Sequence, residues 1–136
     1  MTEDRERFDA ALADAAAAAL EGLRDAAPAL VLAVLSSDDG FEAVRIPRDG
    51  DGDGRFAAIA SSVQALAEAV VHELRIGMGR AIVIQASEGV VIQMRVARLP
   101  FVVSALFTAG EDPGECLAAV GDCSAALAVA LADAPV

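Results

Sequence analysis

The stretch that decides the fold is residues 55–96, where RFAAIASSVQALAEAVVHEL (55–74) is followed by RAIVIQASEGVVIQMRV (80–96). Large apolar residues of the first segment share one arc of a helical wheel and form a large apolar stripe. Its members are Phe56, Ile59, Val63, Leu66, Ala67, Val70 and Leu74. In the second segment two apolar runs flank Ser87-Glu88-Gly89, which predicts a β-hairpin. A helix that leads into a strand pair is therefore expected at the centre of the chain.

A helix and a hairpin are predicted before this central unit. Residues 3–25 carry an apolar stripe at helical spacing and an alanine run, and alanine is the best helix former. ALVLAVLS (29–36) is apolar at nearly every position, as in a strand buried on both faces. Asp39-Gly40 is a strong turn signal, and residues 41–46 alternate like a returning strand.

One strand and one helix are predicted after the central unit. Residues 101–107 are mainly apolar, which predicts the strand. The next segment has the residue types favoured at the N-cap, N1 and N3 of a helix, namely Asp112, Pro113 and Glu115. The order α-β-β-α-β-β-β-α predicts an α+β fold in a single domain over residues 1–136, with an antiparallel sheet between helices.

The composition restricts the partners that the chain can have. Its 136 residues carry a formal net charge of -11, which repels nucleic-acid phosphates and anionic membranes and favours a basic patch on a protein. The first residues are charged and no uninterrupted apolar stretch reaches about 18 residues. We therefore expect no nucleic acid, no membrane insertion and a cytoplasmic location. All 10 basic residues are arginine, which fits a GC-rich bacterial genome.

Four strings, in this order along the chain, resemble the roadblock/LC7 domain family. ALVLAVLSSDDGFEAV (29–44) is similar to its first hairpin and FAAIASSVQALAEAV (56–70) to its central helix. AIVIQASEGVVIQMRV (81–96) is similar to its second hairpin, and FVVSALFTAGEDPGECLAAV (101–120) to its last strand and helix. The acidic loop PRDGDGDG (47–54) is longer than the family pattern.

This resemblance implies a five-stranded antiparallel sheet between helices, similar to profilin. It also implies a homodimer formed through the central helix and the strand after it, without a cofactor. Family members act as non-enzymatic signalling platforms for Ras-like small GTPases or as dynein light chains, and some bacterial members stimulate GTP hydrolysis. Arg45, Arg48 and Arg55 are nearest to the acidic loop, and any of them could serve as an arginine finger.

The candidate interface on the central helix is a set of small residues at its back, opposite the large apolar stripe. This small seam consists of Ala58, Ser62, Ala65 and Ala69. On the pattern alone, the seam fits an alanine-rich surface as well as a close helix contact, and the resemblance favours an interface. The following strand is expected at a sheet edge, without a proline or an inward charge to block pairing with its twin. Its central residues are Ile82, Val83 and Ile84.

The remaining features favour ordinary structural roles. Asp49, Asp51 and Asp53 imitate a calcium loop, but Ala60 stands where the bidentate glutamate belongs, so we expect a metal-free loop with an aspartate capping the helix. The two cysteines are seven residues apart on one helix, which is too far for a disulfide, and are expected to be buried. His72 has no neighbouring nucleophile and is expected to be exposed or at a subunit contact.

Two functional hypotheses of different classes follow. The first is a regulatory platform for a small GTPase, and the second is a sensing domain that holds a small molecule between sheet and helix. A sensor needs a pocket with convergent polar groups, whereas the expected core is almost entirely aliphatic. The sequence also lacks a nucleophile motif and a phosphate-binding loop, so an enzyme is not expected.

Overall fold

The computed structural model describes residues 2–48 and 54–132, with side chains from residue 10 onward. The elements in chain order are α1 (Thr2–Ala26), β1 (Leu30–Ser37), β2 (Glu42–Ile46), α2 (Arg55–Leu74), β3 (Ile82–Ala86), β4 (Gly89–Arg95), β5 (Phe101–Thr108) and α3 (Pro113–Ala130). This is the order that the sequence predicts.

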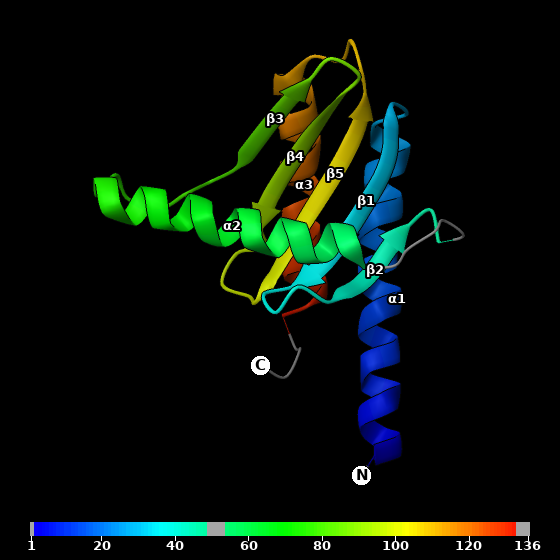
Figure 1. Cartoon of the computed structure of the whole chain (residues 1–136). Coiled ribbons are helices and arrows are strands. Elements are labelled where there is room, and N and C mark those ends of the chain that lie inside the picture. The colour runs from blue at the N-terminus through cyan, green and yellow to red at the C-terminus, as the bar shows by residue number, and fades with distance from the viewer. Residues whose placement is uncertain (1, 49–53, 133–136) are drawn as a thin grey trace.

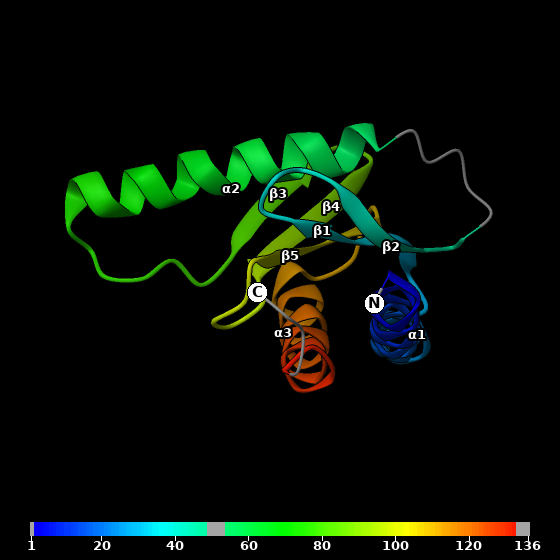
Figure 2. The same ribbon diagram turned by 90° about the horizontal axis from the view of Figure 1, so that it is seen from below.

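Five strands form one antiparallel sheet in the order β2-β1-β5-β4-β3. The helices α1 and α3 cover one face of the sheet, and α2 crosses the other face (Figure 1 and Figure 2). The predicted five-stranded sheet between helices is therefore confirmed. Since β3 ends the strand order, the prediction that it forms an edge is confirmed as well.

The main hydrophobic core lies between the sheet and the helix pair α1 and α3. Successive residues of a strand point to opposite faces, so alternate residues of β1 and β5 point into this core. Phe107 is the largest of the fully buried side chains. Other buried members include Leu20 and Leu23 of α1, Leu35 of β1, Ile92 of β4, and Val120 and Leu127 of α3.

The helix α3 begins as its sequence predicts, because the Asp112 side chain accepts a hydrogen bond from the Glu115 backbone N–H at 3.3 Å. By length and composition alone, α3 could cross a membrane. Its buried residues form one stripe toward the sheet and α1, as in a core helix. They are Cys116, Val120, Cys123, Ser124 and Leu127.

The helix α2 packs on β1, β4 and β5, while its C-terminal half projects past the β3 edge (Figure 1 and Figure 2). Its N-cap is Gly54, a left-handed residue with φ of 76°, rather than the predicted aspartate. The acidic residues 49–53, and with them the predicted metal-free loop, lie outside the described residues.

Candidate interaction surface on α2 and β3

Four large side chains of the large apolar stripe of α2 are exposed rather than packed on the sheet. Leu66 has 69% of its surface exposed, and Ile59, Val70 and Leu74 are also more than half exposed. Of the residues of α2, only Ala57 and Ala60 are buried. Phe56, Val63 and Ala67 of the same stripe are half-buried, so the large apolar stripe lies along the side of α2 and is only partly covered by the sheet.

The polar surface of the sheet under α2 explains this orientation. Ser36, Gln93 and Ser104 are buried side chains of β1, β4 and β5. Buried polar groups need hydrogen-bond partners, and Gln93 finds its partners on α2, which must therefore lie close to the sheet. Alanines at the contact allow that approach, whereas leucine or isoleucine would hold the helix away.

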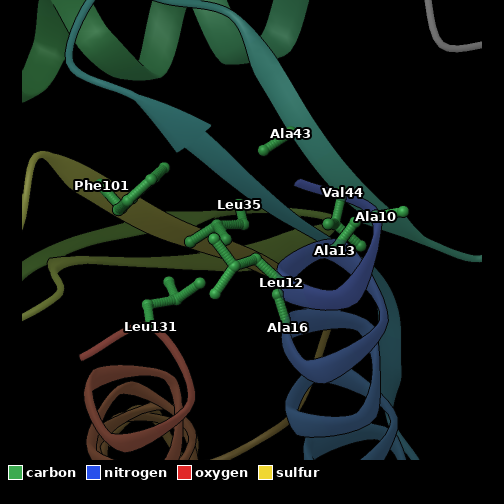
Figure 3. Close-up of a pocket in the computed structure, with 9 residues that line it drawn as sticks. All are labelled: Ala10, Leu12, Ala13, Ala16, Leu35, Ala43, Val44, Phe101 and Leu131. Carbon is green, nitrogen blue, oxygen red and sulfur yellow. The ribbon is translucent and has the colours of Figure 1, made fainter. Parts of the chain in front are cut away.

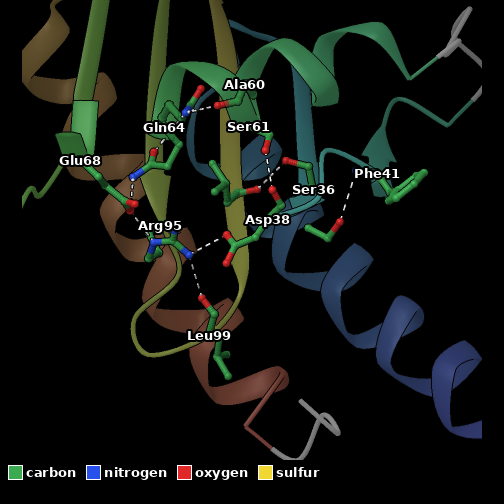
Figure 4. Close-up of polar contacts among 12 residues, drawn as sticks. Ser36, Asp38, Phe41, Ala60, Ser61, Gln64, Glu68, Arg95 and Leu99 are labelled. Atoms are coloured by element: carbon green, nitrogen blue, oxygen red, sulfur yellow. Dashed lines mark hydrogen bonds and ion pairs between the residues drawn. The ribbon is translucent and has the colours of Figure 1, made fainter. Parts of the chain in front are cut away.

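A chain of hydrogen bonds fastens α2 to the sheet (Figure 4). Gln93 donates through Nε2 to the Ala60 carbonyl at 2.8 Å and to Gln64 Oε1 at 3.1 Å. Ser104 Oγ donates to Gln93 Oε1 at 3.3 Å. Gln64 Nε2 in turn donates to Glu68 Oε1 at 3.2 Å. Gln93 therefore joins β5, β4 and α2 from a buried position.

The same chain ends in two ion pairs of Arg95. Its Nε donates to Glu68 Oε1 and its Nη1 to Asp38 Oδ1, both at 2.7 Å. The hydrogen bond from Arg95 is the largest cause that lowers the pKa of Glu68, and the bond from Gln64 adds to it. The same bond to Glu68 raises the pKa of Arg95. Both groups are therefore charged in the folded protein.

The Glu68 pair predicts an acid-sensitive contact. A carboxylate whose pKa is lowered on folding contributes stability above its unfolded pKa, near 4.5, and this stability is lost as the pH falls through the folded pKa. Because Glu68 is partly exposed, we expect a loss of only about 0.2–1 kcal/mol. Urea unfolding at pH 7 and pH 3 should show a smaller pH-dependent loss in Glu68→Gln than in the unmodified protein. An equal loss in both would contradict the prediction.

The small seam lies on a third side of α2, and all four of its residues are exposed. Ala58 lies against Gly40 of the β1–β2 turn, where an added Cβ would come within 3.3 Å of the Ala58 Cα. Ala65 lines a small pocket of about 250 Å³ together with Asp38 and Arg95. Part of the seam thus makes room for the chain's own β1–β2 turn.

Apolar side chains continue from α2 onto the linker and β3. Ile76 and Met78 of the linker are exposed, Met78 at 91%, and so are Val83 and Ile84 of β3, while Ile82 is half-buried. We define the apolar face as the exposed side chains Ile59, Leu66, Val70, Leu74, Ile76, Met78 and Ile84, because Val83 points to the opposite side of the sheet. It joins the projecting half of α2 to an open strand edge.

A row of aliphatic side chains extends this surface across the sheet. Leu32, Leu106, Val91 and Ile84 lie opposite one another on four adjacent strands. The row is two residues along from the buried pair of Gln93 and Ser104, so it points to the same side of the sheet as α2. Ile84 is exposed and the other three residues are half-buried. We call this set the aliphatic row.

The opposite side of the molecule has an apolar pocket of about 450 Å³ between α1, β1, β2 and the end of α3 (Figure 3). Its lining residues are Ala10, Leu12, Ala13, Ala16, Leu35, Ala43, Val44, Phe101 and Leu131. None of these side chains carries a polar atom that could orient a ligand. The volume suits a small molecule, but the lining lacks the groups expected of a sensor.

Neither cysteine is poised for chemistry. Both are free and buried, and burial raises the pKa of Cys116 and raises that of Cys123 to about 11. The prediction of buried cysteines is confirmed. We expect both thiols to resist Ellman's reagent at pH 8 until urea unfolds the chain. Rapid labelling of one thiol in the folded protein would contradict this expectation.

The remaining candidates are dispersed. Arg45 is held by Glu42, with 3.5 Å between Nε and Oε1. Arg48 follows β2, Arg55 begins α2, and His72 is exposed near the far end of α2. Within residues 2–48 and 54–132, no group of three or more His, Cys, Asp or Glu side chains is arranged to hold a metal ion.

Solved structures share this architecture, although no protein-family model and no curated protein matches the chain. A roadblock/LC7 domain from Streptomyces avermitilis has 19% identity and a TM-score of 0.73, covering 82% of this chain and 93% of that one. The gliding protein MglB from Thermus thermophilus has 17% identity and a TM-score of 0.78, with coverages of 91% and 93%. An MglB described with a tetrameric arrangement has 17% identity and a TM-score of 0.80, with coverages of 92% and 93%.

The geometry places this chain among small α+β domains that have an antiparallel sheet between helices. The structural neighbours make the class specific, since this chain has the roadblock/LC7 fold. The resemblance inferred from the four sequence strings is confirmed at the level of the fold.

Proposed function

We propose that the chain forms a homodimer through its apolar face. The dimer then serves, in the cytoplasm, as a non-enzymatic regulatory platform for a Ras-like small GTPase. The observation that carries the proposal is the apolar face itself, because seven large apolar side chains are exposed on α2, its linker and an open strand edge. Contiguous apolar surfaces of this kind are typical of protein interaction sites.

The geometry suggests how two copies fit together. A two-fold axis beside β3 would pair Ile82, Val83 and Ile84 with their twins and extend the sheet across both subunits. The projecting half of each α2 would then lie over the partner's sheet, next to the aliphatic row. Leu66 and Val70 would meet the partner helix. In this arrangement the large apolar stripe, rather than the small seam, forms most of the helix contact.

The proposed GTPase partner rests on two further observations. The fold is shared with MglB structures, and the sequence implies a GTPase platform through the resemblance stated above. The net charge of -11 favours a partner with a basic surface and would make association faster at low salt. The dimer leaves the acidic outer surfaces of α1 and α3 free for such a contact.

The partner is tested by capture. The immobilised protein is mixed with a Ras-like GTPase encoded beside it, loaded either with GDP or with a non-hydrolysable GTP analogue. We expect binding that depends on the nucleotide and weakens as salt rises. Binding in neither state would overturn the GTPase assignment. If a small apolar metabolite were captured instead, the pocket near Leu12 and Phe101 would support the sensing alternative.

Stimulation of GTP hydrolysis is expected to act without an arginine finger from this chain. Arg45 is tied to Glu42, Arg48 follows β2 at the sheet edge opposite β3, and Arg55 lies at the N-terminus of α2, far from its projecting half. Single Arg45→Ala, Arg48→Ala and Arg55→Ala variants should each leave the stimulated rate within about twofold. An arginine finger contributes roughly 1,000-fold or more, so a loss of that size in one variant would identify it.

A further inference from the structure

The β1–β2 turn, residues 37–41, touches α2 at successive points. Gly40, with φ of 89°, lies against the backbone of Ala58, so no larger residue fits there without strain. One helical turn later, Ser61 Oγ donates to the Asp38 carbonyl at 2.6 Å. A further two turns along, Glu68 meets the same Arg95 that holds the Asp38 carboxylate. The turn and the helix thus share a line of contacts.

Arg95 is the centre of this line. It lies at the end of β4 and reaches carboxylates on two different elements, while its Nη1 also donates to the Leu99 carbonyl at 3.4 Å. The helix is also attached by two buried alanines, by Gln93 and by the Ser61 hydroxyl. Only two residues of α2 are fully buried, and both are alanines near its N-terminus, so the polar contacts of Arg95 help to set the direction of the projecting half.

We propose that Arg95 is a positioning residue that couples the β1–β2 turn to α2. A change in the turn would then alter how tightly two copies associate, although the turn lies outside the apolar face. The second half of this inference rests on the proposed homodimer. The coupling within one chain does not, because all of its contacts are intramolecular.

Hydrogen exchange followed by NMR tests the intramolecular coupling. The background is Leu66→Asp, which is designed to be monomeric. Asp38→Ala should speed exchange of α2 amides beyond Gln64, and Glu68→Ala should speed exchange of the hydrogen-bonded turn amides of Ser37, Asp38 and Gly40. We expect changes of about two- to fivefold, as for partly exposed ion pairs. Effects confined to the mutated element would overturn the coupling.

Matched variants separate positioning from a general loss of stability. Arg24→Ala removes the exposed Arg24–Glu21 pair of α1 and should leave both segments unchanged. Arg95→Met should speed exchange in both segments, and Arg95→Lys should restore part of the protection because it keeps the charge. Equal effects of Arg24→Ala and Arg95→Met would refute a positioning role.

The link to assembly is measured with Leu66 intact. Asp38→Ala should raise the dimer dissociation constant although Asp38 lies outside the apolar face, and an unchanged constant would remove the link to assembly. If the unmodified protein sediments as a monomer, the homodimer proposal fails, while the exchange results still decide the intramolecular coupling.

Discussion

Replacing Leu66 with aspartate is expected to convert the proposed dimer into a monomer at micromolar concentration. Burying a leucine contributes about 1.5–3 kcal/mol, and a two-fold interface counts each substitution twice, for roughly 3–6 kcal/mol. That corresponds to a dissociation constant at least about 100-fold higher, before the cost of burying a charge is added. Sedimentation velocity across a concentration series measures the change.

Two further variants sharpen this test. Val129→Asp places the same charge at an aliphatic position of α3 that is 80% exposed, far from the apolar face, and should leave the dimer intact. Ala65→Arg would split the dimer if the small seam were the interface, but should have a smaller effect than Leu66→Asp if the large stripe is. A monomeric unmodified protein, or dissociation by Val129→Asp alone, would refute this interface.

Replacing Gln93 with leucine is expected to destabilise the protein by about 1–3 kcal/mol. The substitution keeps a similar volume but leaves the buried Ser104 hydroxyl without its acceptor and removes the bond to the Ala60 carbonyl. Urea unfolding should show a lower midpoint with an unchanged slope. Hydrogen exchange should be fastest in α2, because that helix loses its buried anchor.

A double-mutant cycle tests the assignment of this loss. In Gln93→Leu/Ser104→Ala, no hydroxyl is left unpaired, so the double variant should be less destabilised than the sum of the two single variants. Ser62→Ala removes an exposed hydroxyl that bonds only to the Ala58 carbonyl of its own helix, and should be nearly neutral. Additive effects of the two single changes would show that Gln93 and Ser104 are not coupled.

Much of the fold was accessible from local sequence signals. The Asp112 cap and the Asp39-Gly40 turn depend on neighbouring residues, and the structure has both where the pattern places them. The burial of both cysteines could be predicted because they share one apolar stripe of a helix. Predicting that β3 lies at the edge of the sheet required more than a local pattern, because the order of the strands in the sheet came only from the family resemblance.

The orientation of α2 was not accessible in the same way. Helical periodicity identifies an apolar stripe, but it does not say whether that stripe faces the chain's own sheet or another molecule. The signal for the orientation of α2 lies in the strands. Ser36, Gln93 and Ser104 interrupt their apolar runs and form the polar surface of the sheet under α2. The contact between Arg95 and Asp38 joins residues 57 apart in sequence, so no local pattern reveals it.

The open edge at β3 has a consequence for how faithfully a cell assembles this protein. Strand pairing uses backbone groups that every chain carries, and the exposed side chains of the stripe are aliphatic ones that any similar helix can match. Two proteins of this kind would therefore exchange subunits and form mixed dimers unless other contacts disfavoured those dimers. The charged residues at the rim of the apolar face, Glu73, Arg75 and Arg80, are the ones placed to oppose it, because mismatched charges penalise the wrong partner. Changing them should alter which chains associate more than how tightly they do.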